Sequence, residues 1–173
     1  MMQMLHAGGM PVLTDGLRTA DEDNPRGYWE FAPVMGLRRA AEWVPEAVGK
    51  AVKVVHALVT FLPPGYSYRV ILMRRDVREV ISSQNAMLYR RGESGANLSD
   101  VQLAEIYETQ LAELLADLHG RSNFQVMEVA HRDCVFTARD VAGRVNRFLG
   151  GWLDELRMER VSECSLYRQR MPS

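Results

Sequence analysis

The chain has 173 residues, of which 47% are hydrophobic and 25% charged, and its net charge is −1. This composition is typical of one globular domain with a full core, and it excludes a disordered, collagen-like or disulfide-scaffold protein. The charge balance provides no basic field for nucleic acid or an anionic membrane. Cys134 and Cys164 are too few and too widely spaced for a disulfide or zinc framework, so we expect no metal and a reducing, cytoplasmic location.

Neither a membrane span nor a secretory signal is predicted. No apolar run reaches the roughly 18 to 20 residues that a bilayer requires. Residues 1–6 lack the basic segment and the long apolar stretch of a signal peptide.

Apolar periodicity and turn-forming residues predict the elements. In chain order they are a helix over 1–6, a strand over 11–14, a polar loop over 15–27, a helix over 33–48, strands over 51–55 and 66–73, helices over 76–91 and 99–119, a strand over 124–129 and a helix over 137–149. Alternating strands and helices are typical of βαβ units. We therefore expect one α/β domain over 1–173, with a mostly parallel sheet flanked by helices in three layers.

Capping residues support several of these boundaries. Gly8 and Gly9 predict a left-handed cap after the first helix. Asp76 with Glu79 forms a capping-box pattern, and Ser99 with Gln102 forms a second one. Pro45 is expected to bend or restart the helix over 33–48.

The first candidate site follows the strand over 66–73. Arg74 and Arg75 end this strand, and Ser82 and Ser83 lie about two turns along the next helix. Ligands of parallel sheets gather at the carboxyl ends of strands, and an arginine fork matches phosphate oxygens. A phosphate site is therefore predicted here, with a solvated arginine pair as the alternative.

The second candidate site combines Lys53 and His56, next to the strand over 51–55. A histidine can accept a proton near neutral pH, and a lysine can stabilise negative charge on a bridging oxygen. A packed structural histidine is the alternative.

Glu30 is the third candidate, because three aromatic residues surround it in the sequence: Tyr28, Trp29 and Phe31. A carboxylate among aromatic rings is costly unless it is paired or used. We expect either a pocket wall that contains Glu30 or a loop anchored by its aromatic residues.

Three segments together resemble the bacterial sulfotransferase family, a branch of the P-loop-like α/β enzymes. Segment 23–30 (DNPRGYWE) resembles its Asn-Pro-x-Gly-aromatic-aromatic-Glu segment. Segment 75–83 (RDVREVISS) resembles its 3′-phosphate element, Arg-Asp-Pro followed by a distant Ser, with Val77 in place of the proline. Segment 53–63 loosely resembles the Lys-x-His…Leu-Leu-Pro stretch of cytosolic sulfotransferases, with the spacing shifted by one residue.

The resemblance implies a P-loop-like fold and a nucleotide cofactor. The donor would be 3′-phosphoadenosine-5′-phosphosulfate (PAPS), and the product adenosine 3′,5′-bisphosphate (PAP). Arg75 and Ser83 would bind the 3′-phosphate, His56 would be the general base, and Lys53 and Glu30 would complete the catalytic group. The acceptor, a small molecule or carbohydrate with a hydroxyl or amine, is not identified by the residues.

One part of the family pattern is missing. The family begins with a strand and a Pro-x-Ser-Gly-Thr loop that holds the 5′-phosphosulfate, and residues 1–5 resemble the helix after that loop. No Gly-rich phosphate loop occurs elsewhere in the chain. We therefore expect an N-terminally truncated fold, whose sheet rearranges or is completed by a second copy of the chain.

Three interpretations remain open at this point. The leading one is a sulfotransferase-family domain whose activity in this form is doubtful. The second is a non-catalytic relative that binds the nucleotide or only assembles with partners. The third, a small-molecule kinase, is disfavoured because the Gly-x-x-x-x-Gly-Lys-Ser/Thr loop is absent.

Overall fold

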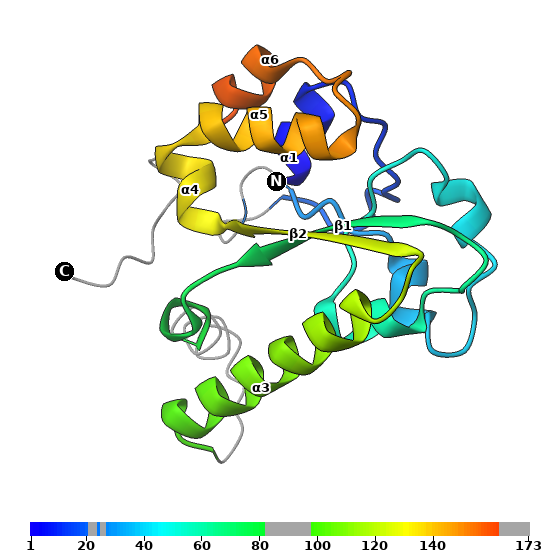
Figure 1. Ribbon diagram of the computed structural model, residues 1–173, viewed down its shortest axis with the longest axis vertical. Coiled ribbons are helices and arrows are strands. Elements are labelled where there is room, and N and C mark those ends of the chain that lie inside the picture. The colour runs from blue at the N-terminus through cyan, green and yellow to red at the C-terminus, as the bar shows by residue number, and fades with distance from the viewer. Residues whose placement is uncertain (21–23, 25–26, 82–97, 163–173) are drawn as a thin grey trace.

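A computed structural model describes residues 1–20, 24, 27–81 and 98–162. A two-stranded parallel sheet lies at its centre, formed by β1 (Tyr68–Arg74) and β2 (Phe124–Ala130). The register pairs Tyr68 with Phe124 at one end and Arg74 with Ala130 at the other. The crossover between the strands contains the long helix α3 (Asp100–His119). The expected βαβ unit is therefore present (Figure 1).

Helices cover both faces of this sheet. Figure 1 shows α3 on one side and α1 (Met2–Ala7), α5 (Ala138–Leu149) and α6 (Glu155–Arg160) on the other. The strands alternate accordingly. Ile71 and Val129 pack into the core beneath α1, α5 and α6, whereas Leu72 and Phe124 pack against α3. This part of the chain therefore has three layers, although the sheet within the described residues has only two strands.

Three apolar clusters form the core. The first joins α1, α5 and α6 to the sheet and includes Met4, Val145 and Met158. The second joins α3 to the opposite face and includes Leu111 and Leu118. The third, around Val34, Leu37, Trp43, Val44 and Leu58, lies in the N-terminal half away from the sheet.

The strands expected over 11–14 and 51–55 are wrong. Their residues form only an isolated parallel bridge between Val12 and Ala51. Val52 and Val54 instead pack into the third core cluster. Strand geometry requires hydrogen-bonding neighbours over several residues, and these two segments meet over too short a length.

The single helix expected over 33–48 is also wrong. Two short 3₁₀ helices occupy its ends, η1 (Ala32–Gly36) and η2 (Val44–Ala47), each with a proline in its first turn. Pro45 cannot donate a backbone hydrogen bond, and Gly36 favours helix less than other residues do. A third 3₁₀ helix, η3 (His56–Phe61), follows the segment 51–55.

Helix boundaries elsewhere agree with the predicted caps. Ser99 and Gln102 form the expected reciprocal capping box of α3. After α1, the left-handed residue is Gly9, with φ +98°, while Gly8 stays right-handed. Asp76 caps the next helix as expected, because its carboxylate accepts the amide of Arg78 at 2.8 Å, while the Glu79 carboxylate pairs with Arg75 at 3.2 Å.

Two short helices were not expected. α4 (His131–Phe136) directly follows β2, and α6 lies beyond the last expected helix, in a polar and arginine-rich segment. The carboxylate of Asp154 caps α6 by accepting the amide of Arg157 at 3.0 Å. Met158, fully buried in the first core cluster, explains why this polar helix packs onto the domain. None of the described helices is long and apolar enough to cross a bilayer.

Candidate functional site

Glu30 and Lys53 lie together, although 23 residues separate them in the sequence. The Lys53 ammonium donates to Glu30 Oε1 at 3.2 Å and to the Tyr28 carbonyl at 3.1 Å. Arg18 contacts the same carboxylate at 3.2 Å, and its guanidinium lies 3.3 Å from the centre of the Tyr28 ring. Two cations therefore flank one half-exposed carboxylate, which gives this cluster a net positive charge.

Backbone contacts position the loop that carries Glu30. The Thr14 hydroxyl donates to the Glu30 carbonyl at 2.8 Å, and the Asp15 amide donates to the same oxygen at 3.2 Å. The Asp15 carboxylate in turn accepts the amides of Ala32 and Leu17. These hydrogen bonds, first that of Ala32 and then that of Leu17, lower the pKa of Asp15 from its ordinary value.

Trp29, next to Glu30, has an unusual backbone. Its φ is +55°, the left-handed region that side chains other than glycine rarely adopt. The indole ring packs 5.1 Å from the His6 ring, and its buried Nε1 has no hydrogen-bond partner among the described residues. Such strain persists only where the surrounding structure determines it, and it often accompanies function.

Arg75 lies where the sequence places it, directly after β1 at the carboxyl edge of the parallel pair. Its Nε donates to Glu79 Oε2 at 3.2 Å, and the Glu79 side chain is only 7% exposed. Arg74, the last residue of β1, contacts Glu108 of α3 at 3.3 Å and Glu128 of β2 at 3.7 Å. The two arginines therefore have different carboxylate partners.

The other half of the predicted phosphate site cannot be placed. Ser82 and Ser83 lie outside the described residues. The described part of their helix covers only 77–81, and Val77 and Ile81 are buried there.

His56 contacts other residues than Lys53 and Glu30 do. It is the first residue of η3, and its Nε2 is 3.4 Å from Gln110 Oε1 of α3. Its ring meets the edge of Tyr107 with centres 5.3 Å apart. The three-residue separation from Lys53 suggested a shared site, but the turn into η3 directs the two side chains to different partners.

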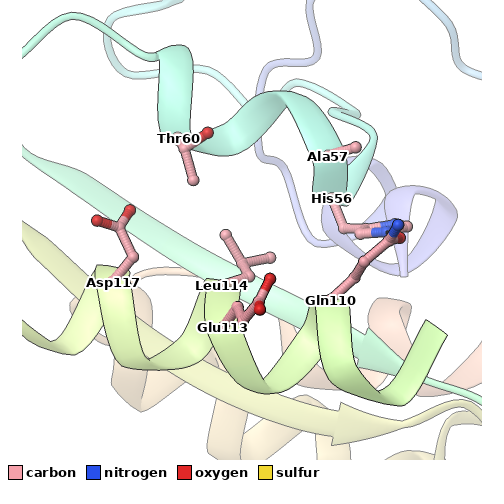
Figure 2. Close-up of a pocket in the computed structure, with 7 residues that line it drawn as sticks. All are labelled: His56, Ala57, Thr60, Gln110, Glu113, Leu114 and Asp117. Carbon is pink, nitrogen blue, oxygen red and sulfur yellow. The ribbon is translucent and has the colours of Figure 1, made fainter. Parts of the chain in front are cut away.

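His56 lines a groove between η3 and α3, with a volume of about 340 Å³. Figure 2 shows His56 and Gln110 meeting at one end and Asp117 near Thr60 at the other. Leu114, a buried residue, lies between them. Arg121 closes the Asp117 end, because it contacts Asp117 at 2.8 Å and donates to the Thr60 carbonyl at 3.0 Å.

Sequence reasoning missed three residues of these clusters. Arg18 lies in a polar loop with no pattern to distinguish it from solvated arginines. Gln110 and Glu113 lie on an amphipathic helix, where periodicity marks the apolar residues and assigns polar ones to solvent. Only the packing of η3 against α3 reveals that these polar residues line a groove.

The described residues contain no group of three or more His, Cys, Asp or Glu side chains that could hold a metal ion. Cys134 is buried with a free thiol, and burial raises its pKa. Cys164 lies outside the described residues.

Comparison with known proteins finds no matching family model, no similar curated protein and no similar solved structure. Functional inference for this chain therefore depends on its residues and on the geometry described above.

Proposed function

We propose that this chain is the nucleotide-binding part of a sulfotransferase-like domain, and that Arg75 binds the 3′-phosphate of PAPS or PAP. The observation that supports this most directly is the position of Arg75. It follows β1 at the carboxyl edge of a parallel strand pair, the edge at which ligands of open α/β sheets bind.

The side chain of Arg75 suits a phosphate. Its Nε pairs with the buried carboxylate of Glu79, which orients the planar guanidinium. A phosphate would be bound through the terminal nitrogens, whose fork geometry matches two phosphate oxygens. Ser83 remains the proposed second contact, from the sequence resemblance alone.

The residues fit only half of the cofactor. No Gly-rich loop for a 5′-phosphosulfate occurs in the 173 residues. We therefore derive no sulfuryl-transfer step, and the catalytic roles of His56, Lys53 and Glu30 stay predictions. The proximity of Lys53 and Glu30 supports their assignment to one group, whereas His56 would act from the groove along α3.

Calorimetric titration with PAP tests the proposal. We expect the Arg75→Ala variant to bind PAP about 10- to 100-fold more weakly, because a charged hydrogen-bond donor to the phosphate is lost. Arg74→Ala is the matched control, since it removes the same charge one residue earlier from a side chain held by other carboxylates. Adenosine 5′-monophosphate, which lacks the 3′-phosphate, should bind both variants equally.

Two outcomes would overturn this assignment. One is a folded wild-type chain that does not bind PAP. The other is an equal loss of affinity in the Arg74 and Arg75 variants, which would indicate a general charge effect. Arg75→Lys keeps the positive charge and the pairing with Glu79, so this variant should fold. A PAP affinity between those of the wild type and Arg75→Ala would then assign the loss to phosphate recognition and not to a folding defect.

A further inference from the structure

We propose that the groove between η3 and α3 binds an acceptor that carries an ammonium group, with Glu113 as the pairing carboxylate. This inference rests on the proposed function in one respect: the ligand is called an acceptor because a sulfotransferase-like domain would modify it. The binding itself depends only on the groove.

The charge of the groove supports a cationic ligand. Its lining contains two carboxylates, those of Glu113 and Asp117, and neither lysine nor arginine. Asp117 is neutralised by Arg121. Within the described residues Glu113 has no ion-pair partner, so one negative charge remains available to a ligand. An anionic molecule would be repelled from this wall.

The shape of the groove favours an organic amine over a metal ion. Its volume of about 340 Å³ suits a small molecule. The buried side chain of Leu114 forms an apolar surface between the polar ends. The carboxylates and His56 do not form a metal-ion group among the described residues. One carboxylate beside an apolar surface is suited to an ammonium group attached to a hydrocarbon or ring.

Residue spacing sets the two ends of the groove along α3. Gln110 contacts His56, and Glu113 lies about one turn further along the helix. A bound molecule would place its hydroxyl near His56 and its ammonium near Glu113.

Three probes with the same hydroxyphenyl ring test this inference: tyramine is cationic, 4-ethylphenol neutral and 3-(4-hydroxyphenyl)propionate anionic. We titrate each into the labelled chain and follow NMR shifts of Gln110 and His56. Tyramine should bind most tightly and the propionate most weakly. In Glu113→Gln, tyramine affinity should fall about two- to fivefold, as expected for an exposed ion pair. Glu105→Gln, an equal charge change on α3 outside the groove lining, should have no effect.

The inference is overturned if the three probes bind equally, if none shifts the groove residues, or if both variants behave alike. Titration of the same samples with PAP separates this failure from that of the proposed function. PAP binding without selective tyramine binding overturns the groove assignment only. Tyramine binding through Glu113 without PAP binding supports the amine site and overturns its role as an acceptor site.

Discussion

Two parts of the molecule, residues 8–67 and the chain from residue 68 onward, follow the local sequence pattern to different degrees. From residue 68 onward, β1, α3, β2 and α5 occur close to their expected positions. Over residues 8–67, two expected strands reduce to one bridge and one expected helix becomes two 3₁₀ helices. The difference shows that a capped helix without internal proline follows the local pattern, whereas a helix interrupted by Pro45 does not form and a strand depends on a neighbour.

Matched core substitutions in the two parts of the chain should produce the largest changes in the free energy of unfolding. The same change to alanine is made at two leucines. Leu118 is fully buried between α3 and the sheet, and Leu37 is 3% exposed in the third cluster. We expect Leu118→Ala to lower the free energy of unfolding by about 3 to 5 kcal/mol, because α3 and the sheet cannot close the cavity. Leu37→Ala should cost about 2 to 3 kcal/mol, because turns and 3₁₀ helices relax more readily. Urea unfolding measures both, and an equal or reversed order would contradict the proposed difference between the two parts of the chain.

The capping box of α3 should have a smaller effect. Ser99→Ala removes the hydroxyl that accepts the Gln102 amide at 3.2 Å and should cost about 1 kcal/mol. Ser99→Asn retains a capping acceptor and is the control. If both variants unfold at the wild-type urea midpoint, α3 is held by tertiary packing and its cap contributes little.

The pH dependence of the loop that carries Glu30 should be the smallest effect. The folded state lowers the pKa of Asp15, so its carboxylate stabilises the fold above the ordinary carboxyl pKa, and this contribution is lost as the pH falls through the lowered value. Below about pH 4 the amide of Ala32 should therefore lose its protection from hydrogen exchange. Asp15→Asn should abolish this titration, and an unchanged pH response in that variant would assign it to another group.

The site residues also differ in how far the sequence predicts them, because some depend on local pattern and others on contacts between distant segments. Arg75 could be placed from the sequence, because it directly follows a strand whose apolar run is distinct. The pairing of Lys53 with Glu30 could not be derived from local pattern, since it joins two loops 23 residues apart. His56 was grouped with Lys53 because of short sequence separation, and the turn into η3 separates their contacts.

The sequence by itself determined the α/β class, the amphipathic helix α3 with its cap, and the parallel strands on either side of it. These features depend on residue spacing, local hydrogen bonds and β-branched runs, all of which neighbouring residues specify. Only the tertiary structure decided that Arg18 and Lys53 share one carboxylate, that Glu79 pairs with Arg75, and that η3 and α3 enclose a groove beside Glu113. The physical reason is that charged and polar contacts form between surfaces brought together by burial of the apolar core, and no local pattern records which surfaces meet.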